Sequence, residues 1–210
     1  MSVDVAYPVF HTPDPALALG VARQLLNVGD QEYAQEYARV SVDVELPRVE
    51  DVLLVLEAMP DAWFRKEDTD DWFRDQSDPT GLHAGIHGPQ LSTDAAFLST
   101  HLPLWASMLD QPVGSIEDTF TAVASTYMAE IHWSFLGWPE VPERDLYADY
   151  KHAEVSVLFN AANREMDEWS NGHTVLVHVR RRNGEGYEER HTSWLAEQVG
   201  KTVIGPPQFC

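Results

Sequence analysis

Two histidines in a glycine-rich stretch come closest, by residue type and spacing, to a metal site. His83 and His87 lie four residues apart within residues 81–88, and such a pair binds a metal ion when both imidazoles share one helix face. The glycines of this stretch favour a loop instead. The candidates for a third ligand are His101, Glu130 and His132. The sequence therefore offers His83, His87 and His132 as a candidate metal site, against the simpler interpretation of a surface loop with two ordinary histidines.

Motifs for nucleophilic and phosphate chemistry are incomplete in this chain. Residues 200–202 (Gly-Lys-Thr) resemble the end of a phosphate-binding loop, but Leu195 stands where that loop needs a glycine. The sequence has no Gly-x-Ser-x-Gly elbow, and its one cysteine is Cys210. The sequence thus favours a non-enzymatic protein that uses no cofactor beyond the candidate metal.

A five-residue motif, Asp-x-Trp-Phe-Arg, occurs twice in an acidic stretch, at residues 61–65 and 70–74. Tryptophan and arginine are among the residue types that most often anchor protein interfaces. The candidate partner-binding residues are Trp63, Phe64, Arg65, Asp68, Asp70, Asp71, Trp72, Phe73 and Arg74. The simpler interpretation, which the residue types alone favour, is that one copy packs on the core and the other caps a helix end.

The charge of the chain is strongly negative and unevenly distributed. The net charge is −20, and residues 1–170 carry 30 acidic and 9 basic side chains. Such a field attracts cationic partners and repels nucleic acid and anionic membranes. We therefore expect a basic protein partner, no direct contact with nucleic acid and no membrane association. Genome composition or adaptation to high salt would produce a similar bias.

Cysteine usage and hydropathy bear on the compartment. A single cysteine allows no disulfide within the chain, which is typical of a reducing cytoplasm. No run without a charged residue is longer than 15 residues; the run 95–109 has this length and contains a proline, so it is too short to cross a bilayer. We expect a cytoplasmic protein.

Hydrophobic periodicity predicts both helices and strands. Alternation predicts strands over residues 2–10 and 39–46, and an Asn-Gly turn at 183–184 predicts a hairpin. The hairpin strands would be residues 173–182 and 185–192. Helical spacing predicts helices over 15–28, 47–60, 94–109, 115–135 and 144–169, with a short strand at 155–159 as an alternative within the last. We expect the glycine- and proline-rich residues 75–91 to form a loop.

These elements predict an α+β fold in which about five helices pack on a small, mostly antiparallel sheet with a C-terminal β-hairpin. The length of 210 residues fits a single domain over 1–210. If the chain divides, the break falls at the prolines near 139–142. It would separate a helical core of residues 1–138 from a helix plus β-hairpin of residues 143–210.

The acidic field and the paired tryptophan motifs together favour an acidic interaction protein that binds a basic partner. Inhibitors, immunity proteins and nucleic-acid mimics work in this way, because acidic charge speeds capture and buried aromatic rings lengthen the lifetime of the complex. Two alternatives stay open. One is a small hydrolase-type enzyme with a histidine metal site. The other is a structural or assembly subunit that forms homo-oligomers.

Overall fold

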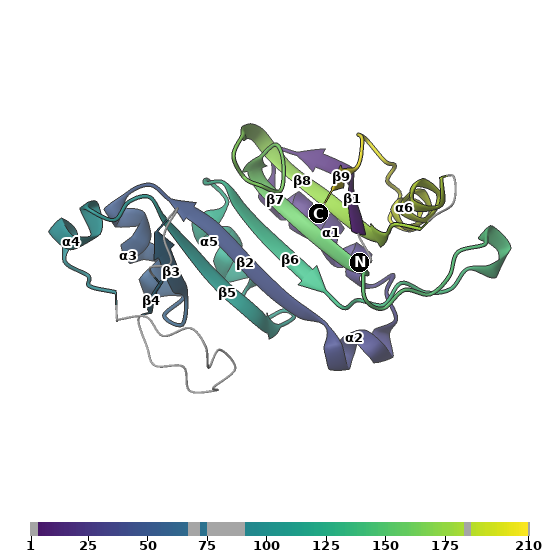
Figure 1. The fold of residues 1–210 in the computed structure, drawn as a ribbon, viewed down its shortest axis with the longest axis horizontal. Helices are drawn as coiled ribbons and strands as arrows, with labels where there is room; N and C mark the ends of the chain where they lie inside the picture. The colour runs from purple at the N-terminus through teal and green to yellow at the C-terminus, as the bar shows by residue number, and fades with distance from the viewer. Residues whose placement is uncertain (1–3, 67–71, 75–90, 183–185, 210) are drawn as a thin grey trace.

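The computed structural model describes residues 4–66, 72–74, 91–182 and 186–209. Its strands are β1 (Asp4–Thr12), β2 (Arg39–Leu46), β3 (Trp63–Lys66), β4 (Trp72–Arg74), β5 (Leu104–Pro112), β6 (Ala129–Ser134), β7 (Glu154–Ala161), β8 (Trp169–Arg180) and β9 (Gln208–Phe209). They form one sheet in the order β4-β3-β5-β2-β6-β7-β8-β1-β9 (Figure 1). Every neighbouring pair in it is antiparallel. The predicted α+β class with an antiparallel sheet is confirmed, but the sheet is large rather than small.

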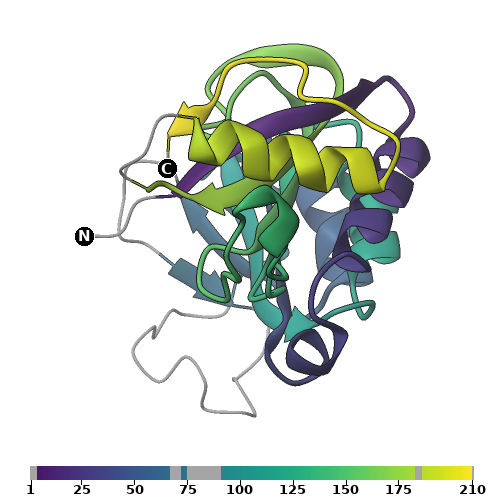
Figure 2. The ribbon, with the colours of Figure 1, turned by 90° about the vertical axis from the view of Figure 1, so that its right-hand side faces the viewer.

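The helices of the described residues are α1 (Pro15–Leu26), α2 (Gln31–Tyr37), α3 (Val49–Ala58), α4 (Ala95–Ser99), α5 (Glu117–Ala124), α6 (Tyr187–Gln198) and the 3-10 turn η1 (Pro142–Arg144). In Figure 1 α1, α3 and α5 lie behind the sheet, and Figure 2 shows them on one side of it. α1 packs on β7 and β8, while α3 packs on β2 and β5. α6 crosses the end of the sheet that β8 and β1 form.

One face of the sheet is apolar, and the other carries polar side chains beside a small second cluster of buried apolar residues that includes Ala6, Leu158 and Leu176. Along β2, Val40, Val42 and Val44 are fully buried among the side chains that contact the helices, while Ser41 and Asp43 point the other way. The same alternation in β1, β6, β7 and β8 places a group of polar side chains on the side opposite α1, α3 and α5. We call this side the polar face; its members are Asp4, Asp43, Glu130, His132, Glu154, Ser156 and His178.

Where local signals were strong, the elements form as predicted. β2 covers residues 39–46, and α3 lies within the predicted range 47–60. α1 begins after Asp14, whose carboxylate accepts hydrogen bonds from the backbone N–H groups of Ala16 and Leu17, and Pro15 takes the first helical position.

Two predicted helices are instead short helices followed by strands. The range 94–109 contains α4 and then β5, and the range 115–135 contains α5 and then β6. Both strands lie inside the sheet, where each pairs on two sides. The backbone N–H and C=O groups of β5 and β6 form hydrogen bonds with the strands on either side, where a helix would have used bonds within its own turns. This cross-strand pairing outweighs the helical spacing of the apolar residues.

Two further predictions at the C-terminal end are wrong. The helix predicted over 144–169 is absent, and β7 occupies 154–161, which agrees with the strand kept as the alternative for 155–159. β8 forms the first strand of the predicted hairpin, but the second strand is replaced by α6. β8 already pairs with β7 on one side and with β1 on the other, so no edge of β8 is left for a hairpin partner. The predicted break near 139–142 does not interrupt the sheet, since strands from both sides of it pair with each other.

Candidate functional site

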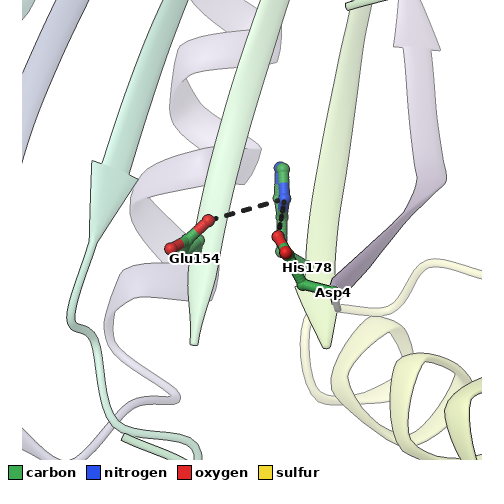
Figure 3. A group of neighbouring side chains, drawn as sticks. All are labelled: Asp4, Glu154 and His178. Atoms are coloured by element: carbon green, nitrogen blue, oxygen red, sulfur yellow. Dashed lines mark ion pairs between the residues drawn. The ribbon is translucent and has the colours of Figure 1, made fainter. Parts of the chain in front are cut away.

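Three adjacent strands bring one histidine and two carboxylates together on the polar face. Glu154 of β7 lies directly opposite His178 of β8. On the other side of β8, Ala6 of β1 lies opposite His178, so Asp4, two residues before Ala6 on the same face, lies diagonally across from it. The three side chains point toward one another (Figure 3). Nδ1 of His178 is 3.6 Å from Oδ2 of Asp4 and 3.7 Å from Oε2 of Glu154.

A second histidine closes these contacts into a ring. Nε2 of His178 lies 3.1 Å from the hydroxyl oxygen of Ser156, and that oxygen lies 2.9 Å from Nδ1 of His132. Nε2 of His132 returns to Oε2 of Glu154 at 3.4 Å. Glu154, His178, Ser156 and His132 therefore form a closed ring of polar contacts across β6, β7 and β8.

Burial keeps both imidazoles of the ring neutral at neutral pH. His178 is fully buried, and desolvation lowers its pKa even though the carboxylate of Asp4 opposes the shift. Desolvation, reinforced by the nearby His178, lowers the pKa of His132 to about 4. A neutral imidazole still donates one N–H, so the hydrogen bond from His178 lowers the pKa of Asp4 to about 2. The pair is thus an ionised carboxylate beside an uncharged ring.

The second carboxylate of the group is in a different electrostatic position. Burial, together with the negative charge of Asp4, raises the pKa of Glu154 to about 7. Its side chain is 19% exposed, so solvent reaches it. Near neutral pH the site therefore carries one or two negative charges held close to neutral imidazole nitrogens.

A second acidic pair continues along the polar face toward β3. Asp43 of β2 and Glu130 of β6 lie opposite each other. Burial is the main cause that raises the pKa of Asp43 to about 6, and the hydroxyl of Ser107 donates a hydrogen bond to it. Glu130 is 3.4 Å from Nε of Arg164. The guanidinium of Arg65 lies further along, 5.2 Å from the ring centre of Trp105.

The order Asp4, His178, Ser156 resembles the order of groups in serine hydrolases, in which a carboxylate orients a histidine that activates a serine. Here Ser156 is fully buried, and its hydroxyl lies between two imidazoles in the middle of a strand. A substrate carbonyl cannot reach that oxygen without displacing them. The arrangement is therefore suited to holding a cation among carboxylates and neutral imidazoles rather than to acyl transfer.

The structure describes one of the three residues of the sequence-predicted metal site. His132 is part of the ring, whereas His83 and His87 lie outside the described residues. No local signal joined Asp4, Glu154 and His178, because they are far apart in the chain. The one local signal was the alternation of Glu154 and Ser156 with Val155 and Val157. It indicates that Glu154 and Ser156 share a polar face only if the segment is a strand.

The predicted partner-binding residues occupy one end of the sheet. The two copies of the motif form the adjacent strands β3 and β4, with Trp63 opposite Arg74 and Phe64 opposite Phe73. Phe64 is fully buried in the core, so it is not a surface anchor in this structure. Trp63 and Arg65 lie on the polar-face side, and Trp63 is 6% exposed. The side chains of residues 72–74, like Asp68, Asp70 and Asp71, lie outside what the structure describes.

Comparisons with protein-family models, with curated proteins and with solved structures find no match to this chain. Among the described helices, none has the length and apolar character needed to cross a membrane.

Proposed function

We propose that this protein binds a basic protein partner and that the polar face is the surface that receives it. The observation that carries the proposal is the row of carboxylates across the face: Asp4, Asp43, Glu130 and Glu154. They come from four different strands and lie within a molecule of net charge −20. A long-range acidic field speeds the encounter with a cationic protein, and fixed carboxylates then select where it docks.

The electrostatics of the row favour a cationic ligand. Asp43 and Glu154 have raised pKa values because burial and neighbouring negative groups disfavour their charged forms. An arginine or lysine side chain placed beside either carboxyl would remove its penalty, since an opposite charge within ~4–6 Å favours the ionised form of a carboxyl. The stabilisation would be larger than at an exposed surface pair, because these groups are already largely withdrawn from water.

Two tryptophans lie at the β3 end of the face, and each exposes only a small part of its side chain. Trp63 and Trp105 lie on neighbouring strands beside Arg65, adjacent to the acidic pair of Asp43 and Glu130. An interface with charged groups beside tryptophan matches the composition of known interaction hot spots. The inhibitor, immunity or nucleic-acid-mimic type of function expected from the sequence is the class of interaction that such a face would serve.

The test compares two double variants with equal charge changes. In D43N/E130Q both substitutions lie on the polar face, and in E32Q/E57Q both lie on exposed helix positions. Each tagged protein is incubated with lysate of the native host, washed at low and then high salt, and analysed by mass spectrometry. Affinities for the basic protein that is captured are then measured by calorimetry.

The wild-type protein and E32Q/E57Q are expected to retain one basic protein in stoichiometric amount and to release it in high salt. D43N/E130Q is expected to bind it at least about tenfold more weakly, since losing one partner of a buried charge pair costs 2–5 kcal/mol or more. Equal affinity of the two double variants would contradict the assignment of the polar face. A wild-type bait that retains no basic protein at low salt would contradict the function itself.

A further inference from the structure

We propose that Asp4, Glu154 and His178 form a binding site for a divalent transition-metal ion of the zinc class. The proposal is independent of partner binding and rests on a different part of the polar face from Asp43 and Glu130. One imidazole nitrogen and two carboxylate oxygens, one from each residue, all lie within 4.8 Å of one another. This is a mixed donor set, and nitrogen together with carboxylate oxygen is the combination that zinc accepts in proteins.

The spacing of the donor atoms matches ligands that share one ion. Nδ1 of His178 is 3.6 Å and 3.7 Å from the nearest oxygens of Asp4 and Glu154. Two ligands at zinc–ligand distances of 2.0–2.2 Å in a tetrahedral site lie roughly 3.3–3.6 Å apart. The observed distances are longer than ordinary hydrogen bonds and close to this value, so an ion enters with small side-chain movements.

The surroundings of His178 orient it as a ligand. Its ring is fully buried and directs Nδ1 toward both carboxylates, while Nε2 lies 3.1 Å from the hydroxyl oxygen of Ser156. A histidine that binds a metal through one nitrogen almost always donates from the other to a polar group, which fixes the tautomer and the ring plane. Ser156 supplies that group here. Without an ion, the N–H of His178 faces Asp4 through Nδ1. Metal binding would need the other neutral tautomer, in which Nε2–H donates to Ser156 and the lone pair of Nδ1 binds the ion.

His132 lies beside the site, next to Glu154, although it is not one of the three residues whose donor atoms all lie within 4.8 Å of one another. Nε2 of His132 is 3.4 Å from Oε2 of Glu154, and its Nδ1 also contacts the hydroxyl oxygen of Ser156. The hydroxyl oxygen can accept a hydrogen bond from each histidine, so one serine would orient both rings. The backbone beneath all four residues is paired β-sheet, which holds the donors rigidly. Asp4 is 22% exposed and Glu154 19%, which leaves a route for the ion from solvent.

The experiment titrates Zn²⁺ into the chelator-treated full-length protein and follows heat, unfolding temperature and, with Co²⁺ in its place, visible absorption. The ligand variants are D4N and E154Q. Their matched controls are D43N and E45Q, which make the same chemical changes on the same face of the sheet, away from the site. H83Q/H87Q removes the histidine pair that the sequence suggested. Unfolding curves establish that each variant folds. If one of the two ligand variants does not fold, the other still tests the site.

We expect the wild-type protein to bind one Zn²⁺ per chain and its unfolding temperature to rise, since an ion that binds only the native state stabilises it. D4N and E154Q should each weaken binding at least about tenfold, and D43N, E45Q and H83Q/H87Q should bind like the wild type. The proposal is overturned if the wild type binds no Zn²⁺ in this titration. It is equally overturned if E154Q and D4N bind like the wild type, or if only H83Q/H87Q loses the ion. Loss of partner binding in D43N/E130Q with Zn²⁺ binding intact would separate the two proposals.

Discussion

Replacing Asp43 by asparagine is expected to stabilise the protein at neutral pH and to leave it nearly unchanged in acid. Asp43 lies on β2 between Ser107 of β5 and Glu130 of β6. Burial makes its charged form unfavourable, and Glu130 adds to the effect, while the hydrogen bond from Ser107 only partly compensates. Asparagine keeps the shape and one acceptor oxygen for Ser107, and it carries no charge at any pH.

The size of the effect follows from the pKa. The pKa of Asp43 is about 6 in the folded protein against an ordinary value of 3.8, and each pKa unit corresponds to 1.36 kcal/mol, which gives about 3 kcal/mol. Because the folded pKa is raised, the folded state holds its proton more tightly than the unfolded state. The corresponding stabilisation is complete below pH 3.8 and is lost as the pH rises through about 6. D43N has no ionisable group at this position, so its free energy of unfolding does not decrease in this way as the pH rises.

The assay is urea unfolding of wild type and D43N at a series of pH values from 3.8 to 7, with the free energy of unfolding extrapolated to water. The difference between the two proteins should grow by about 3 kcal/mol in favour of D43N across that interval. D61N, at an exposed position, serves as the control and should show no such growth. A difference between wild type and D43N that is constant with pH would refute the reasoning, because it would mean that the carboxyl of Asp43 is as well solvated in the folded state as in the unfolded state.

Substitutions at three other positions probe two buried polar side chains and one strand glycine with a positive φ, each read by urea unfolding. The carboxylate of Glu117 accepts hydrogen bonds from two backbone N–H groups and from the indole N–H of Trp133, so E117A should cost roughly 3–5 kcal/mol and E117Q clearly less. Burial lowers the pKa of His191 to about 4, so its stabilisation is present above pH 6.5 and is lost as the pH falls toward 4; H191F should remove up to about 3 kcal/mol of that dependence. Gly172 of β8 has φ +132°, and an added Cβ would lie 2.8 Å from Nε2 of His11, so G172A should destabilise by roughly 1–3 kcal/mol, whereas an equal stability would mean that the strand relaxes at this position.

Prediction from sequence succeeded where one short segment contains its own signal. The strict alternation of residues 39–46 identified β2 to the residue, because one buried and one polar face give a period of two. The aspartate and proline at positions 14 and 15 located the start of α1, because a side-chain acceptor and a fixed φ stabilise the first helical turn regardless of the rest of the fold.

Prediction failed where both faces of a strand are withdrawn from water. In β6, Ile131 and Trp133 face the helices while Glu130 and His132 lie on the polar face. The apolar residues before and after this segment also fit a helical spacing, so the sequence alone favoured one long helix over 115–135. Pairing with β2 and β7 decided the outcome, and those partners are distant in the chain.

The candidate metal site could not be predicted for the same reason. Asp4, Glu154 and His178 have no fixed spacing along the chain, and each belongs to a strand whose neighbours are set by the sheet order. The sequence indicated His83 and His87, because spacing along the chain can identify only ligands that are close together in the sequence. Of the sequence-predicted ligands, His132 lies beside the site, while His83 and His87 lie outside the described residues.

The sequence by itself determined the properties that depend on composition or on near neighbours: an acidic molecule, an α+β class, an antiparallel sheet and the capped helix that follows β1. Only the tertiary structure decided which strands lie side by side, and therefore which charged groups meet. A carboxylate has an ordinary pKa in the unfolded chain. It becomes a potential cation ligand at Asp4, Asp43 or Glu154 only when strand pairing withdraws it from water and places histidines or other carboxylates within a few ångströms.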